Sequence, residues 1–179
     1  ASNPVFETCA APGSDEFVGD ALAVDTWDRV LREEAARHVV ADGALTIPTY
    51  EGGVAAAPLL QQELPDGAWQ VTTKVTVDAT QRFQQAGLLL WAADDHYAKL
   101  DLGRATPGPT VELVHHERGS NRMDSAAPRI PGTTTIWLRL TSDGDAVRAA
   151  VSYDGITFER YGRDIEGATF THVGPYAFR

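Results

Sequence analysis

Residues 85–104 read Q-A-G-L-L-L-W-A-A-D-D-H-Y-A-K-L-D-L-G-R, with two contrasting patterns on either side of a polar turn. Residues 86–92 are apolar throughout, as in a strand that is buried on both faces. Residues 97–102 alternate between an apolar set and a polar set (Ala98, Leu100 and Leu102 against Tyr97, Lys99 and Asp101). Residues 94–96 (D-D-H) separate the two halves. The stretch therefore predicts an antiparallel hairpin with a polar second face.

The same alternation predicts further strands on both sides of this hairpin. They cover residues 69–77, 111–118, 135–141, 147–153 and 157–161, and a last strand at 173–178 closes against the first. Turn dipeptides Asp-Gly follow or precede several of them, at 66–67, 143–144 and 154–155. Residues 119–133 are rich in Ser, Pro and Gly and predict a long irregular loop that is functional or mobile.

The segment from residue 27 to residue 47 carries competing signals. Residues 33–37 have good helix propensity, whereas residues 39–47 read as strand, Asp-Gly turn and strand. We expect a strand near 27–32, at most one helical turn, and then a hairpin. Residues 1–13 are interpreted as a lead or linker, and residues 14–179 as one domain.

Length and charge limit the possible functions. The chain has 179 residues, 43% hydrophobic and 22% charged, which fits one folded domain. Its net charge of -10 argues against nucleic acid and anionic membrane surfaces as partners. No apolar run is long enough for a membrane span. Cys9 is the single cysteine, so no internal disulfide forms.

Many strands with regular turns and almost no helix predict an all-β sandwich. Several short motifs occur in a familiar order: residues 14–17 (SDEF), Trp27, 42–47 (DGALTI), 86–90 (AGLLL) with 97–100 (YAKL), 137–140 (WLRL) and 152–158 (SYDGITF). Their order resembles concanavalin A-like lectin/glucanase modules. Among these are the C-terminal modules of bacterial β-xylosidases and laminin G-like domains of secreted actinobacterial proteins. The likeness spans about residues 14–178.

The resemblance implies a jelly-roll β-sandwich of two antiparallel sheets, one of them concave, from a secreted bacterial protein with further domains in a longer chain. It also implies carbohydrate binding on the concave face or at the loop rim. A structural calcium ion is a further implication, with Asp15 and Glu16 as candidate ligands, and no organic cofactor is expected. Because relatives with this fold include glycosidases, function does not follow from the fold.

Catalysis by this domain alone is not favoured by the sequence. Glycoside hydrolysis normally needs two carboxylates on either side of the scissile bond. The E-x-D-x-E strand motif of laminarinase-like relatives is absent, and Glu112 and Glu117 point to opposite faces of a regular strand. No G-x-S-x-G elbow is present. His115 and His116 are also adjacent on a strand, so they cannot share a metal ion without a bulge.

A sugar groove combines aromatic rings with planar polar side chains. The predicted strands place such residues together on one face: Trp91, Tyr97, Lys99, Asp101, Glu112, His116, Trp137 and Arg139. A merely solvated sheet face also carries outward charges, and the exposed aromatic Trp137 favours a contact surface. We therefore predict a non-catalytic carbohydrate-binding or accessory module that binds an oligosaccharide or polysaccharide. A glycoside hydrolase domain acting on plant or microbial polysaccharide, and a structural laminin G-like protein-interaction domain, remain as alternatives.

Overall fold

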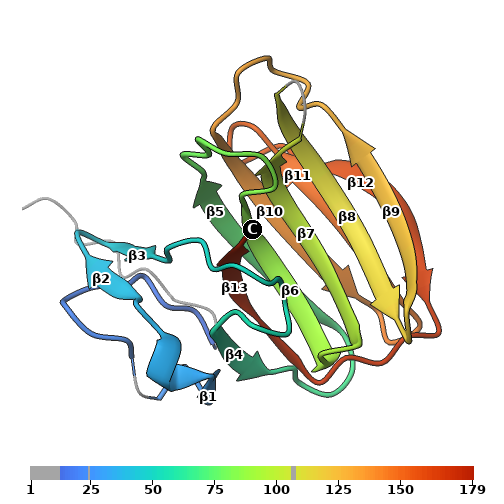
Figure 1. The fold of residues 1–179 in the computed structure, drawn as a ribbon. Coiled ribbons are helices and arrows are strands. Elements are labelled where there is room, and N and C mark those ends of the chain that lie inside the picture. The colour runs from blue at the N-terminus through green and yellow to red at the C-terminus, as the bar shows by residue number, and fades with distance from the viewer. Residues whose placement is uncertain (1–12, 24, 106–107) are drawn as a thin grey trace, which may run out of the picture.

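The computed structural model describes residues 13–23, 25–105 and 108–179, which form two packed β-sheets and a small hairpin (Figure 1). Apart from Gly13, the predicted lead lies outside the described residues, and so does Cys9. Within the described ranges, no helix has the length and apolar character needed to cross a lipid bilayer.

The larger sheet has seven strands, in the order β1 (Arg29–Leu31), β4 (Leu59–Glu63), β13 (His172–Phe178), β6 (Gln85–Ala93), β7 (His96–Arg104), β8 (Pro109–Glu117) and β9 (Ser120–Ala126). The smaller sheet has four, in the order β12 (Glu159–Glu166), β11 (Ala146–Ser152), β10 (Thr135–Ser142) and β5 (Trp69–Thr76). Neighbouring strands in both sheets are antiparallel. The predicted jelly-roll sandwich of two antiparallel sheets, one of them concave, is confirmed.

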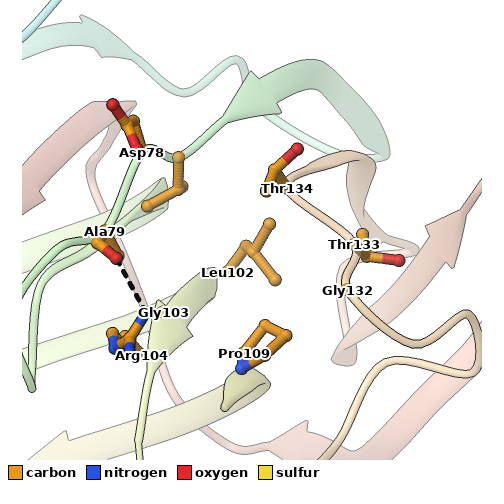
Figure 2. A pocket seen from close by; sticks show the side chains of 10 residues that line it. Asp78, Ala79, Leu102, Gly103, Arg104, Pro109, Gly132, Thr133 and Thr134 are labelled. Carbon is orange, nitrogen blue, oxygen red and sulfur yellow. Dashed lines mark hydrogen bonds between the residues drawn. The ribbon is translucent and has the colours of Figure 1, made fainter.

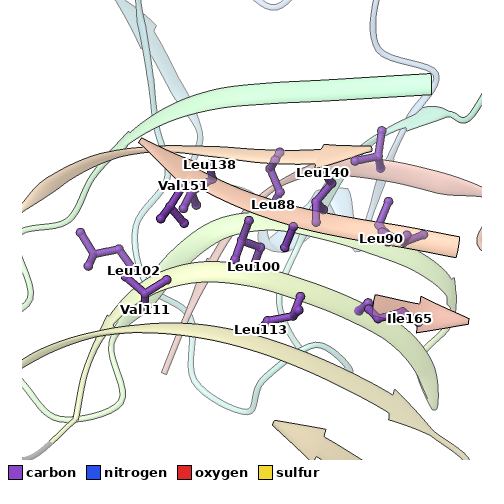
Figure 3. Packing of buried hydrophobic residues seen from close by; sticks show 14 of the residues in the cluster. Leu88, Leu90, Leu100, Leu102, Val111, Leu113, Leu138, Leu140, Val151 and Ile165 are labelled. Carbon is purple, nitrogen blue, oxygen red and sulfur yellow. The ribbon is translucent and has the colours of Figure 1, made fainter. Parts of the chain in front are cut away.

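The main core lies between the two sheets and is made of branched aliphatic side chains (Figure 3). Its fully or nearly fully buried members include Leu88, Leu90, Leu100, Leu102, Val111 and Leu113 from the larger sheet and Leu138, Leu140, Val151 and Ile165 from the smaller one. The even-numbered side chains of β6 and β7 point into this core, as their alternation predicted.

The ambiguous N-terminal segment folds as expected. β1 ends at Leu31, a single 3₁₀ turn covers Glu33–Ala35, and β2 (Val39–Ala41) and β3 (Ala44–Thr46) form a two-stranded hairpin. Asp42 and Gly43 make its turn with φ of 53° and 71°. Positive φ at both central positions is the requirement of a type I′ turn, which Asp-Gly satisfies.

Two expectations about strands are wrong. Residues 119–133 are not one irregular loop, because β9 occupies Ser120–Ala126 and pairs with β8 along its whole length. β9 is an edge strand of mainly polar, largely exposed residues, so it lacks the apolar alternation of a half-buried strand. The last strand, β13, does not close against the first strand; it lies between β4 and β6 within the larger sheet.

The segment between β3 and β4 passes over the outer face of the larger sheet, the face turned away from the smaller sheet (Figure 1). Val54 and Ala57 from this segment are buried against Leu89, Tyr176 and Phe178 of that face. A second, smaller core therefore covers the β4–β13–β6 part of the outer face. Within the described ranges, the more open rest of this face, called the β7–β9 part, spans β8, β9 and the Tyr97 end of β7.

The larger sheet depends on a glycine at its centre. A Cβ added at Gly174 of β13 would lie 1.8 Å from the backbone oxygen of Leu60 in β4, far inside contact distance. We predict that Gly174→Ala lowers the free energy of unfolding by about 3 kcal/mol, because β4 must move away from β13. Urea unfolding measures this.

Gly108→Ala is the matched control, because a Cβ there meets no atom within 4 Å and its φ is not positive. It should change the free energy of unfolding by less than about 0.5 kcal/mol. Equal effects of the two substitutions would show that strand spacing at Gly174 does not limit stability.

Candidate functional site

The strand register places six of the predicted ligand-binding residues on the outer face. Trp91, Tyr97 and His116 are directly paired across β6, β7 and β8. Asp101 is paired with Glu112 two rows further along, and Lys99 lies between the two rows. Side-chain alternation points all of these residues away from the main core.

The two predicted ligand residues of β10 lie elsewhere, so their assignment to this face is wrong. Trp137 and Arg139 belong to the smaller sheet and point out on the opposite side of the sandwich. Each is already packed there: Lys74 lies 5.0 Å from the centre of the Trp137 ring, and the Arg139 guanidinium lies 3.5 Å from the centre of the Phe158 ring. Alternation predicted their outward direction correctly but not which sheet they join.

Asp101 is on the expected face but is not accessible to a ligand. Its exposed fraction is 0%, and that of Lys99 is 6%. The Asp101 Oδ2 atom accepts hydrogen bonds from Lys99 Nζ at 2.7 Å and from the Tyr176 hydroxyl at 2.7 Å. Lys99 also donates to Gln85. These two predicted binding residues therefore form a buried polar cluster that supports the sheet beneath the open surface.

The third member of this buried cluster is Tyr176 of β13, whose hydroxyl donates to Asp101. Burial raises the pKa of Tyr176 well above its usual value, and the neighbouring Asp101 carboxylate adds to the effect. The hydroxyl therefore stays protonated and donates to the carboxylate. A buried carboxylate with a buried ammonium partner avoids the large cost of an unpaired charge in the interior.

The open part of the face lies over β7, β8 and β9. The Tyr97 and His116 rings are stacked, with centroids 4.9 Å apart and planes 19° from parallel. His116 Nδ1 donates to the Asn121 side-chain oxygen at 2.7 Å, which fixes the imidazole. Burial raises the pKa of Tyr97, so its hydroxyl stays a donor near neutral pH. The Glu112 side chain is 21% exposed and adds a carboxylate two rows further along the same face.

Trp91 stands at the boundary between the open and the covered parts of the face. The Arg29 guanidinium lies 4.8 Å from the centre of its ring, and His172 meets the ring edge-on. Its indole N–H donates to Asp94 at 3.3 Å. The indole is therefore half-buried and held on several sides, with one part left at the surface.

Asp101 and Glu112 are two neighbouring carboxylates, the group type that glycoside hydrolysis requires. Lys99 Nζ lies between them, 2.7 Å from Asp101 and 3.7 Å from Glu112. Because Asp101 is fully buried, a scissile bond cannot approach it, and the pair lacks the open space that an acid and a nucleophile need on either side of a sugar.

A pocket of about 290 Å³ lies at the end of the sandwich where β7 ends and β8 begins (Figure 2). Leu102, Pro109 and Val77 give it an apolar floor, with Thr133 and Thr134 at the side. Its rim includes the end of the segment 119–133, which its length had marked as functional or mobile. The Arg104 guanidinium donates a hydrogen bond to the Ala79 carbonyl at 3.1 Å, and both residues line the pocket.

Asp15 and Glu16 were expected to hold calcium. Both oxygens of Asp15 accept hydrogen bonds, from the Phe17 N–H and from the Trp27 indole, each at 2.7 Å. Among the described residues, no third acidic or imidazole side chain approaches them closely enough to share an ion. Calcium takes six to eight oxygen ligands. The pair does not fit such a site, and calcium binding stays a prediction.

The buried cluster generates a stability prediction. Asp101→Ala leaves the Lys99 ammonium buried without its carboxylate, and we expect the free energy of unfolding to fall by about 3–5 kcal/mol. Tyr176→Phe removes only one hydrogen bond to the carboxylate and should cost about 1.5–3 kcal/mol. Chemical denaturation followed by tryptophan fluorescence measures both. A near-neutral Asp101→Ala would contradict the assignment of Asp101 to the interior.

Comparison with solved structures identifies the fold. The chain superposes on the GH43 protein BlXynB from Bacillus licheniformis with a TM-score of 0.76 and 18% identity, covering 92% of this chain and 35% of that one. It superposes on the xylan beta-1,4-xylosidase of Bacillus halodurans with a TM-score of 0.75 and 17% identity, covering 99% of this chain and 38% of that one. For a functionally unknown protein of Saccharomyces cerevisiae the TM-score is 0.62 and the identity 19%, and the match covers 91% of this chain and 88% of that one.

The chain thus spans only a little over a third of the two bacterial proteins. A search of curated proteins found no significant match. The model of the family described as "Beta xylosidase C-terminal Concanavalin A-like domain" matches residues 15–176, nearly all of the chain. The chain belongs to the family of concanavalin A-like C-terminal domains of β-xylosidases, the accessory domain of GH43 glycoside hydrolases.

Proposed function

We propose that this accessory domain binds a short saccharide, without cleaving it, on the open β7–β9 part of the outer face of the larger sheet. The observation that carries the proposal is the stacked Tyr97–His116 pair, with the partly exposed Glu112 two rows further along the same face. We further propose that the domain acts within a longer, secreted bacterial chain.

The open surface has the chemistry that a sugar ring needs. The C–H faces of a pyranose ring pack on aromatic rings, and its hydroxyls bond to planar polar groups. Tyr97 and His116 supply the rings, and Glu112 and Asn121 supply acceptors within the same part of the sheet. The stack and the His116–Asn121 hydrogen bond fix these rings before binding, which lowers the entropy cost of association.

Xylo-oligosaccharides are the first ligand class to test. A solved relative is a xylan beta-1,4-xylosidase, and the family is named for β-xylosidases. The domain would then keep its parent enzyme close to the polymer, raising the effective concentration of substrate.

The test is calorimetric titration of the domain with xylotriose to xylohexaose, in the wild type and in two variants of the face. His116→Ala removes one ring of the stack, and Glu112→Gln removes the acceptor charge. Each is expected to weaken binding about tenfold, which corresponds to about 1.4 kcal/mol.

Two matched variants on the smaller sheet, Trp137→Ala and Glu159→Gln, serve as controls and should bind like the wild type. Loss of affinity in the controls but not in the face variants would move the site to the opposite sheet. A domain that binds no xylo-, arabino- or β-gluco-oligosaccharide would refute the proposal and favour a protein-interaction role. Release of reducing sugar by the isolated domain would favour the hydrolase alternative.

A further inference from the structure

Three metal-ligating side chains meet at the end of the sandwich opposite the pocket of Figure 2. His96 opens β7 and is paired with Glu117 at the end of β8, and His115 lies two residues before Glu117. By alternation all three point to the inner side of the larger sheet, where Ala98 is buried. The imidazole of His115 therefore lies near that of His96, whereas His116, the next residue along β8, points to the other face.

Phe170 holds the two imidazoles in place. Its ring centroid lies 5.3 Å from that of His96 and 6.0 Å from that of His115, and the two imidazole centroids are 6.0 Å apart. One ligand atom from each of His96, His115 and Glu117 can be chosen so that all three lie within 4.8 Å of one another.

The two histidines carry unsatisfied polar atoms. His96 Nε2 and His115 Nε2 are both inaccessible to solvent and have no hydrogen-bond partner among the described residues. A buried polar atom left without a partner costs free energy, and two such atoms from neighbouring rings point to a missing shared partner.

We propose that His96, His115 and Glu117 bind one transition-metal ion, with zinc as the best fit. Two imidazoles and one carboxylate are a common zinc ligand set, whereas calcium and magnesium require oxygen ligands. The ligand atoms of a tetrahedral zinc ion stand roughly 3.3 Å apart, given zinc–nitrogen bonds of about 2.0–2.1 Å. The ion would therefore draw the three side chains together by rotation near the strand ends.

A surface hollow borders the site on the side of His115 and Glu117. This hollow of about 370 Å³ is lined by His115, Glu117, Arg118, Ser120 and Arg122. It gives room for water as a fourth ligand, as in zinc sites with three protein ligands. Arg118 and Arg122 are nearby positive charges that oppose a cation, and the Arg122 guanidinium donates a hydrogen bond to the Asp164 carbonyl at 2.8 Å. The Glu117 carboxylate supplies the compensating negative charge.

The experiment uses the domain without a polyhistidine tag, stripped with a chelator and then titrated with ZnCl₂ in a calorimeter. We expect one equivalent to bind with a micromolar or tighter dissociation constant and to raise the melting temperature. CaCl₂ should do neither. Cobalt(II) should give the visible absorption bands of a four-coordinate nitrogen and oxygen site.

Glu117→Gln should weaken zinc binding at least tenfold, and His115→Gln should abolish the cobalt bands. The melting curve of each metal-free variant shows whether it folds. His116→Gln, adjacent in sequence but on the other face, is the matched control and should bind zinc like the wild type. Absence of zinc binding at 100 μM, or equal binding by Glu117→Gln and the wild type, would overturn the proposal.

Discussion

Side-chain alternation along β6, β7 and β8 is the constraint on which the other features depend. Consecutive residues of a strand point to opposite faces, so Leu100 enters the main core while Asp101 beside it faces outward. A slip of one residue in register would exchange these two environments and place a carboxylate among leucines. The apolar interior therefore fixes which polar groups share the outer face, before any ligand is considered.

The outer face is divided by what covers it. The segment before β4 turns the β4–β13–β6 part into a second core, and the Lys99–Asp101–Tyr176 cluster lies at its border. Buried ion pairs contribute little net stability, but they are costly to break. The cluster links β7 to β13 across the intervening strand β6. The proposed recognition surface is therefore limited to the more open β7–β9 part, and the burial of Asp101 explains why a catalytic role for it is not supported.

Local patterns in the sequence were sufficient to predict most strands, because periodicity and Asp-Gly turns are properties of neighbouring residues. Contacts between distant segments were not predictable in this way. The outward direction of Trp137 was correct, but its sheet depends on the pairing of β10 with β5. Asp101 is buried by Tyr176, which lies 75 residues away. The meeting of His96 with His115 depends on the β7–β8 register, which two separate strand assignments do not give.

The position of β13 also bears on how the polypeptide reaches this fold. β13 comes after every other described strand in the sequence, yet it joins β1 and β4 to β6–β9 in the larger sheet. Until β13 pairs with them, β4 and β6 each present an unpaired edge, and such edges invite association with other chains. Pairings this distant in sequence also form slowly. The larger sheet is therefore most exposed to such association in the interval between the formation of β6 and the docking of β13.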